Sequence, residues 1–292
     1  MNSENQFQLD RRAVRRSFDR AAASYDDVAV LQREVQSRLL ERLDLINFTP
    51  AAILDAGAGT GNGVRALTGR YPESAVMALD VAERMLAAIP GDQPRVCGDI
   101  EALPFPDQRF DLVWSNLAVQ WLSDPDRGFN ELRRVLNEYG LLLFSTFGPE
   151  TLTELRAAWA EVDDFNHVNQ FIDMHDLGDA LVRAGFAEPV MDVEHLTLTY
   201  EDIGGLLRDL KGLGAHNVTA GRPRGLTGRA TLNELKQAYE RWRSDGRLPA
   251  TWEVVYGIAW APKAFEHVAL AHQGEIPPGE LRELLRRKRH GG

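Results

Sequence analysis

The eleven residues from Ala52 to Asn62 read AILDAGAGTGN. A short apolar run ends in the carboxylate of Asp55, and the turn that follows has glycine at alternate positions, Gly57, Gly59 and Gly61. Glycine accepts positive φ angles and has no side chain, so it suits a turn that joins a buried parallel strand to a helix and lets a ligand approach the backbone. The segment predicts a nucleotide-like cofactor at the end of that strand.

The composition is that of a soluble globular protein with one large α/β domain or two small ones. Of 292 residues, 44% are hydrophobic and 26% charged, and the formal net charge of -10 argues against a generally cationic surface for nucleic acid. Cys97 is the only cysteine, which excludes an intrachain disulfide and a thiolate metal cluster and fits a reducing compartment. No apolar run approaches the roughly 20 residues that span a bilayer, and residues 1–8 lack a signal-peptide core, so a cytoplasmic protein without a membrane partner is predicted.

Strand and helix patterns alternate through the first half of the chain. Strands are expected over 52–55, 75–80, 96–98, 110–115 and 140–146, and helices over 10–45, 63–69, 83–89 and 125–136. This alternation predicts an α/β fold with a mostly parallel, twisted, Rossmann-like sheet and helices on both faces. The second half is expected to contain helices over 150–161 and 175–184 and strands over 193–200 and 253–260. If those two strands pair, the segment between them leaves the sheet and returns, as a substrate lid would.

The spacing of the glycines decides between cofactors. A dinucleotide-binding turn has glycines at positions one, three and six, whereas this turn, counted from Gly57, has them at one, three and five, with Asn62 at six. The carboxylate of Asp55 would repel a pyrophosphate. S-adenosylmethionine carries a sulfonium and an ammonium group and no phosphate, so an acidic, glycine-lined pocket predicts that cofactor.

Three further strand ends support S-adenosylmethionine. Asp80, followed by Val81, ends the second strand, where a carboxylate can accept both ribose hydroxyls. Asp99 can accept the adenine amino group while Ile100 packs on the ring. Asn116 ends the fourth strand, facing the crevice that ligands use in such sheets. The predicted cofactor-binding residues are therefore Asp55, Gly57, Gly59, Gly61, Asp80, Val81, Asp99, Ile100 and Asn116, and the ordered set resembles the class I S-adenosylmethionine-dependent methyltransferases.

Three longer motifs resemble one family within that superfamily. RSFDRAAASY at 16–25, WSNLAVQW at 114–121 and LKGLGAHN at 210–217 are similar to the malonyl-acyl carrier protein O-methyltransferases of biotin synthesis. The pairs Gly221-Arg222 and Leu226-Thr227 extend the resemblance, which covers about 14–261. It implies methyl transfer to the free carboxylate of a malonyl thioester, giving an ester that enters fatty acid elongation and yields the pimeloyl part of biotin.

The implied chemistry makes modest demands on the protein. A carboxylate has a pKa near 4 and is ionised at neutral pH, so no general base is needed, and positioning can supply about 7–11 kcal/mol. Holding a carboxylate calls for a cation, and Lys211 is the first candidate, with Arg222 second. Tyr25 is expected either to close over the reacting methyl group or to donate a hydrogen bond to the substrate. Trp121, His216 and Arg222 are the expected substrate-binding residues.

The expected partner is malonyl-acyl carrier protein or malonyl-coenzyme A, and the expected state is a monomer. Carrier proteins are generally acidic, so docking on this acidic chain needs a local basic face. Three groups of arginines are candidates: Arg11, Arg12, Arg15 and Arg16; Arg222, Arg224 and Arg229; and the tail residues Arg286, Arg287 and Arg289. Charge runs at termini are usually solvated, which makes the tail the weakest candidate.

No metal site is predicted, because His167, His175 and His195 lack the spacing of two ligands on one helical turn. They are interpreted as surface or core residues. The patterns divide the chain into an N-terminal helical cap (1–50), a cofactor-binding core (51–200), an inserted lid (201–250), a final core strand (251–262) and a basic tail (263–292).

Three alternatives stay open. FGPETL at 147–152 and HDLG at 175–178 also resemble a respiratory complex I assembly factor, which implies hydroxylation of an arginine on a partner protein. A carboxyl methyltransferase for another small acid, similar to the trans-aconitate enzymes, would keep both fold and cofactor. A cofactor-binding regulator without turnover is not excluded by the fold alone.

Overall fold

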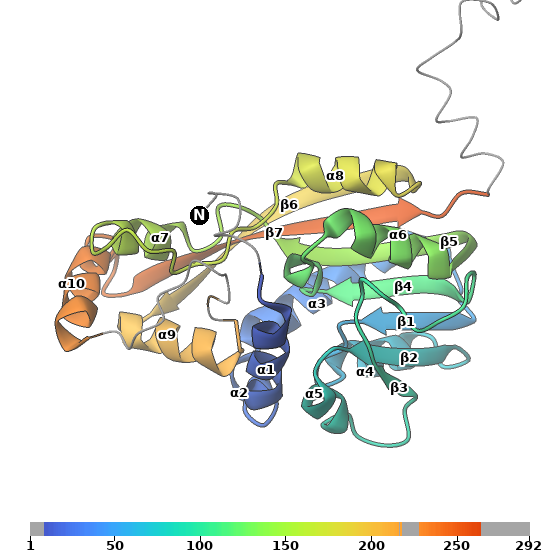
Figure 1. Cartoon of the computed structure of the whole chain (residues 1–292), viewed down its shortest axis with the longest axis horizontal. Coiled ribbons are helices and arrows are strands. Elements are labelled where there is room, and N and C mark those ends of the chain that lie inside the picture. Colours follow the sequence, from blue (N-terminus) through green and yellow to red (C-terminus); the bar gives the residue numbers. More distant parts are fainter. Residues whose placement is uncertain (1–8, 216, 218–227, 264–292) are drawn as a thin grey trace, which may run out of the picture.

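A seven-stranded mixed sheet organises the protein, whose computed structural model describes residues 9–215, 217 and 228–263 (Figure 1). The strand order is β3-β2-β1-β4-β5-β7-β6. The first five strands pair in parallel, and β7 runs antiparallel to both of its neighbours. The strands are β1 (Ala52–Ala56), β2 (Ala75–Asp80), β3 (Arg95–Cys97), β4 (Phe110–Asn116), β5 (Leu136–Phe147), β6 (Ala187–Tyr200) and β7 (Leu248–Trp260). The predicted mostly parallel, Rossmann-like sheet is confirmed.

Helices cover both faces of this sheet. The core on one face includes α3, α4 and, towards β6 and β7, α7, α9 and α10, whereas α6 and α8 pack on the other face. The helices are α1 (Arg11–Ala21), α2 (Tyr25–Val28), α3 (Val30–Leu43), α4 (Asn62–Arg70), α5 (Glu83–Ala87), α6 (Pro125–Val135), α7 (Thr153–Ala160), α8 (Met174–Arg183), α9 (Ile203–Gly212) and α10 (Arg229–Glu240), with a 3-10 turn η2 (Val119–Trp121). None of the helices in the described part is long and apolar enough to cross a membrane.

The central strands are buried on both sides, as parallel strands between helical layers are. Ile53 and Trp114 belong to the core under α3 and α4, while Leu54 and Val113 belong to the core under α6 and α8. Each of these side chains is fully buried. Burying an apolar side chain of this size contributes about 1.5–3 kcal/mol, so the sheet ends that carry polar residues are held on a rigid base.

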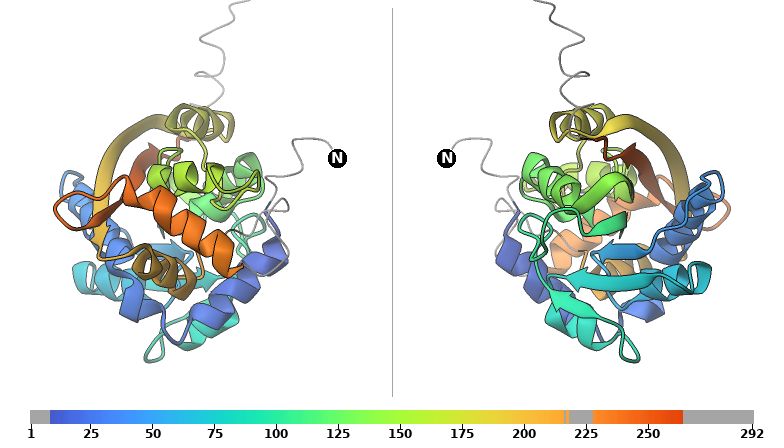
Figure 2. Two further views of the ribbon diagram at one scale, coloured as in Figure 1. Left: turned by 90° about the vertical axis from the view of Figure 1, so that its left-hand side faces the viewer. Right: turned by 90° about the vertical axis from the view of Figure 1, so that its right-hand side faces the viewer.

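The N-terminal region is three helices, where the sequence predicted one continuous helix over 10–45. Asp10 caps α1 by accepting a hydrogen bond from the backbone N–H of Ala13. The chain then breaks twice, at the residues before Tyr25 and at Ala29, whose ψ of 41° is not helical. The breaks turn α1 away from α3, so that α1 packs on α5 at the carboxyl ends of the strands (Figures 1 and 2). Of the three helices, α3 is the one whose apolar residues, Leu31, Val35, Leu39 and Leu43, recur at helical spacing and are all buried in the core.

The two last strands pair with each other, as predicted, and are longer than the sequence indicated. β6 begins at Ala187 instead of residue 193, and β7 at Leu248 instead of residue 253. Pro189 lies in the early part of β6, where a register irregularity falls between Ala187 and Val190, and proline is tolerated on such an edge strand.

The helix predicted over 150–161 is shorter in the structure, because α7 begins only at Thr153. The left-hand view of Figure 2 faces the end where α1, α9 and α10 gather.

Candidate functional site

The candidate site lies at the carboxyl ends of β1, β2, β3 and β4, where the strand order reverses between β1 and β4 (Figure 1). Ligands of doubly wound sheets bind in the crevice at such a switch point. A cavity of about 790 Å³, including its opening to solvent, occupies this place. Its walls come from α1, the start of α2, the strand ends and η2.

The glycine turn after β1 has the backbone that the sequence predicted. Gly57, Gly59 and Gly61 have φ angles of 86°, 54° and 84°, which are left-handed and favour glycine. The N–H of Gly57 donates to the carbonyl of Leu79 at 2.8 Å, which ties the turn to β2. A Cβ atom on Gly57 would lie 2.3 Å from that of Ala118, so the close approach of these two segments requires glycine.

Asp80 holds this turn to the end of β2. Its carboxylate accepts hydrogen bonds from the backbone N–H groups of Gly59 at 2.9 Å and Ala82 at 2.8 Å. Burial raises the pKa of Asp80, while these donors lower it. Asp80 and Val81 both line the cavity, as expected for cofactor-binding residues. The carboxylate is thus positioned before any ligand arrives.

Asp55 faces a second, smaller cavity that adjoins the first. Only 2% of Asp55 is exposed, and burial, followed by the charge of Asp80, raises the pKa of its carboxyl to about 8. Tyr25, Gly57, Gly59 and Asn116 line both cavities, so the two form one continuous site.

Among the residues that line the smaller cavity, three buried side-chain atoms have no hydrogen-bond partner within the described part of the chain: Oε1 of Gln32, Oδ2 of Asp55 and Nε1 of Trp114. An unsatisfied buried polar atom costs about 1–3 kcal/mol, so such a group of three calls for a ligand. Two are acceptors and one is a donor, which complements an ammonium group and a carboxylate. The amino-acid end of S-adenosylmethionine has both, and the residues present therefore fit this cofactor.

Asp99 and Ile100, the predicted adenine residues, line the larger cavity. Asp99 forms an ion pair with Arg11, which also lies 3.4 Å from Glu101. The sequence interpretation missed Arg11 as a cavity residue. The spacing of Arg11, Val14 and Phe18 could have identified Arg11, because residues three and four positions apart share one face of a helix, and all three line the cavity.

Tyr25 and Trp121 both line the larger cavity. Tyr25 begins α2, and its burial, with the charges of Asp80 and Asp26, raises the pKa of the phenol, so that it stays protonated. Trp121 ends η2 and meets Phe18 edge to face, with ring centroids 5.2 Å apart. These two rings form an apolar wall between α1 and the sheet.

Asn116 is fixed by a polar network at the end of β4. Its side-chain amide donates to the carbonyl of Gln32 at 3.1 Å, and its oxygen accepts from the hydroxyl of Ser145 at 2.8 Å. The orientation of Asn116 towards both cavities is therefore determined by α3 and β5 together.

The predicted substrate cation Lys211 is not part of the cavity wall. Lys211 lies exposed in the last turn of α9 and is not among the residues that line the cavity. His216 and Arg222 lie outside the described residues. The segment after Lys211 does reach the site's covering helices, because the hydroxyl of Ser17 in α1 donates to the carbonyl of Gly214 at 2.9 Å.

Comparison with known proteins points to methyl transfer. A family model described as a methyltransferase domain matches residues 54–144. The chain is 56% identical over 272 residues to the malonyl-[acyl-carrier protein] O-methyltransferase of Laribacter hongkongensis, covering 88% of this chain and 92% of that protein. It is 55% identical over 270 residues to the protein of the same name from Gallionella capsiferriformans, covering 88% and 93%.

Solved structures share the fold at much lower identity. The YcgJ protein of Bacillus subtilis superposes with a TM-score of 0.56 at 16% identity, covering 77% of this chain and 98% of that one. Phosphoethanolamine N-methyltransferase 2 of Haemonchus contortus, solved with S-adenosyl-L-methionine, gives 0.53 at 15% identity, covering 84% and 57%. These likenesses support the class I methyltransferase fold.

Proposed function

The chain belongs to the malonyl-[acyl-carrier protein] O-methyltransferase family, and we propose that it transfers a methyl group from S-adenosylmethionine to the free carboxylate of a malonyl thioester on an acyl carrier protein. The observation that carries this proposal is the acidic cavity at the β1/β4 switch point, whose unpartnered atoms fit the cofactor. The product, a malonyl methyl ester, would prime pimeloyl synthesis for biotin.

The cofactor residues have distinct proposed roles. Asp55, with Gln32 and Trp114, holds the amino-acid end, and Asp80 accepts from the ribose hydroxyls beside Val81. Asp99 and Ile100 hold the adenine, which requires Arg11 to share or leave the carboxylate of Asp99. When bound, S-adenosylmethionine supplies a methyl group on a positively charged sulfur, which a carboxylate oxygen can attack.

The protein's contribution to this transfer is positioning and exclusion of water. The malonyl carboxylate is ionised at neutral pH, so no side chain has to remove a proton. The protonated phenol of Tyr25, at the junction of the two cavities, can donate a hydrogen bond to the carboxylate. Phe18 and Trp121 wall the path by which a thioester arm would enter. Fixing two reactants in this way can supply about 7–11 kcal/mol.

We assign selection of the carboxylate to the lid, with Lys211 as its principal cation and Arg222 and His216 as further substrate residues. The hydrogen bond from Ser17 to Gly214 supports this assignment, because it joins the segment after Lys211 to α1. Gly212 supports it too, since a Cβ there would lie 2.9 Å from a methyl of Val28 at the end of α2. The assignment requires α9 to move so that Lys211 reaches the cavity.

The proposed docking surface for the carrier is the outer face of α1. Arg12, Arg15 and Arg16 are exposed there, while Arg11 and Phe18 on the same helix line the cavity. An acidic carrier bound to these arginines would present its thioester arm next to the opening, and opposite charges would speed the encounter. We propose that the protein acts as a cytoplasmic monomer.

The test is purified protein incubated with S-adenosylmethionine and malonyl-acyl carrier protein, followed by intact-mass analysis of the carrier. We expect a gain of about 14 mass units, the mass of one methylene, and none with the acetyl-loaded carrier, which has no free carboxylate to methylate. No gain on the malonyl carrier, with cofactor binding shown by calorimetry, would contradict the proposed substrate and favour another small acid or the hydroxylase alternative.

A further inference from the structure

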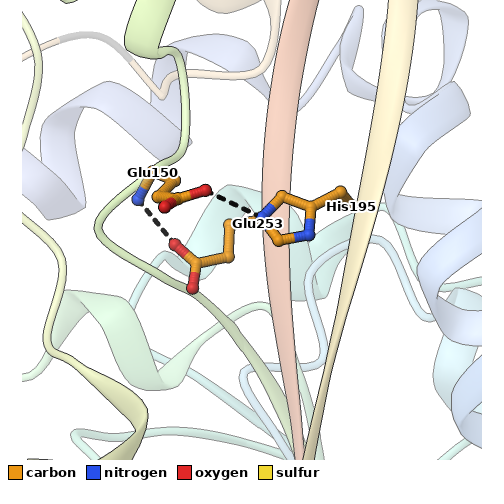
Figure 3. Close-up of side chains that lie close together, drawn as sticks. All are labelled: Glu150, His195 and Glu253. Carbon is orange, nitrogen blue, oxygen red and sulfur yellow. Dashed lines mark hydrogen bonds and ion pairs between the residues drawn. The ribbon is translucent and has the colours of Figure 1, made fainter.

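Three metal-ligating side chains meet at a place distinct from the cofactor cavity: Glu150, His195 and Glu253 (Figure 3). One ligand atom from each lies within 4.8 Å of the other two. Nε2 of His195 is 3.0 Å from a carboxylate oxygen of Glu150. The backbone N–H of Glu150 donates to Oε2 of Glu253 at 2.6 Å.

Two long-range features of the fold build this cluster. His195 on β6 and Glu253 on β7 are direct partners in the antiparallel register, which places their side chains on one face of the sheet. Glu150 comes from the turn that follows β5. Gly148 makes room for the carboxylate of Glu253, since a Cβ at Gly148 would lie 2.6 and 2.7 Å from its two oxygens.

The cluster brings two carboxylates together without a permanent cation. Glu253 is only 8% exposed, and among the ion pairs of the described residues neither it nor Glu150 is paired with arginine or lysine. Like charges held this close destabilise each other, and a buried carboxylate without a cation is costly. His195, half exposed, is the only described partner that can offset this charge.

We propose that Glu150, His195 and Glu253 bind a divalent transition-metal ion, with Zn²⁺ as the preferred ion. One imidazole and two carboxylates are ligands that zinc accepts at about 2.0–2.2 Å, and three protein ligands leave a fourth position for water. The N–H of Glu150 would keep the Glu253 carboxylate oriented, as donors around metal ligands do. Nε2 of His195 binds the ion as the neutral imidazole, and any proton on it is released to solvent.

The ion would join three segments near the carboxyl end of β5: the turn after β5, β6 and β7. Its proposed role is to fix the strands from which the lid segment departs and to which it returns. The proposal does not depend on the proposed methyl transfer, because binding is measured on the protein without substrate or cofactor.

The test is titration of the metal-free full-length chain with Zn²⁺ by calorimetry, comparing the wild type with His195→Ala. We expect one equivalent of zinc to be lost or weakened at least tenfold in this variant, a typical effect of disturbing a metal site. Glu150→Gln, an exposed change that keeps the side-chain size, should weaken the same equivalent.

The matched control is His175→Ala. His175 and Asp173 form a comparable exposed pair, with Nδ1 2.8 Å from the carboxylate, but no third ligand joins them among the described residues. We expect zinc binding by this variant to equal that of the wild type.

A zinc-soaked crystal gives the second readout: an anomalous peak about 2.0–2.1 Å from Nε2 of His195. Undiminished zinc binding by His195→Ala, or a crystal with no peak at this position, would overturn the proposal.

Discussion

The cofactor half and the lid half of this protein are built in different ways. Between β1 and η2, the predicted cofactor residues lie at the carboxyl ends of β1, β2 and β4 or in the short turns that follow β1, β2 and β3. Between β6 and β7, Lys211, the proposed substrate cation, belongs to a segment that leaves the sheet, and the hydrogen bond from Ser17 to Gly214 joins this segment to α1. This difference supports our proposal that the cofactor binds in a preformed site, whereas the substrate is selected by a segment that moves.

Among the substitutions that test this difference between the halves, Asp80→Asn is expected to have the largest effect, a loss of cofactor affinity. Asp80→Asn removes the charge that two backbone N–H groups and, in the proposed complex, the ribose hydroxyls require. Hydrogen bonds to a charged group contribute about 1.5–3 kcal/mol each, so S-adenosylmethionine should bind about 100-fold more weakly. Calorimetry measures this, with Asp245→Asn, an exposed site between α10 and β7, as the control that should bind normally. Equal loss in both variants would remove the distinction between the halves.

A pair of glycines compares backbone rigidity in the two halves. Gly57→Ala combines a φ of 86° with a Cβ 2.3 Å from Ala118, whereas Gly246→Ala has a similar φ of 77° and open space around it. We expect the free energy of unfolding to fall by about 3 kcal/mol for Gly57→Ala and about 1 kcal/mol for Gly246→Ala. Urea unfolding of both variants measures the difference. Equal losses would mean that the close approach at Ala118 is not rigid.

The buried carboxyl of Asp55 predicts a pH dependence specific to the cofactor half. Its pKa of about 8 lies above the value near 4 of an unfolded chain, so the unliganded native state binds the extra proton between these values. Stability from this group is therefore present at low pH and lost as the pH rises towards 8. A cationic ligand favours the ionised form of Asp55. The affinity for such a ligand should therefore rise by up to about tenfold for each unit by which the pH increases towards 8.

Asp55→Asn is the control for this titration. The variant should show a flatter pH dependence of both urea unfolding and cofactor binding between pH 6.5 and 7.5. A variant whose pH profile follows that of the wild type would show that another group titrates.

The smallest expected effect is at the docking surface. Arg12→Glu combined with Arg16→Glu should raise the KM for malonyl-acyl carrier protein about three- to tenfold at low salt and change the KM for malonyl-coenzyme A less. Arg109→Glu is the matched charge reversal, because Arg109 is exposed just before the amino end of β4, whereas α1 lies at the carboxyl ends of the strands; this change should leave both KM values unchanged. Equal changes for both substrates would contradict carrier docking on α1.

The same two halves explain what could be predicted from the sequence. Asp55, Asp80 and Asp99 follow apolar runs at short range, so pattern and spacing placed them at one edge of the sheet, where the structure has them. The break before Tyr25 was missed, because α1 and α3 each keep a helical period and only their packing on α5 and β4 separates them.

The cluster of Glu150, His195 and Glu253 could not be predicted. Its members are 45 and 58 residues apart along the chain, and the antiparallel register of β6 and β7 brings two of them together. The early part of β6 was missed for a related reason: Pro189 argues against a strand unless the strand is known to lie at an edge.

The most direct test that cofactor binding and substrate selection belong to different parts of the protein uses Lys211→Ala. Cofactor affinity and methyl transfer are measured on the same preparation of this variant. Lys236→Ala, also exposed but on α10, is the control that should keep both. We predict that Lys211→Ala binds S-adenosylmethionine like the wild type and fails to methylate malonyl-acyl carrier protein. Normal turnover, or a loss of cofactor affinity that matches the loss of turnover, would contradict the account.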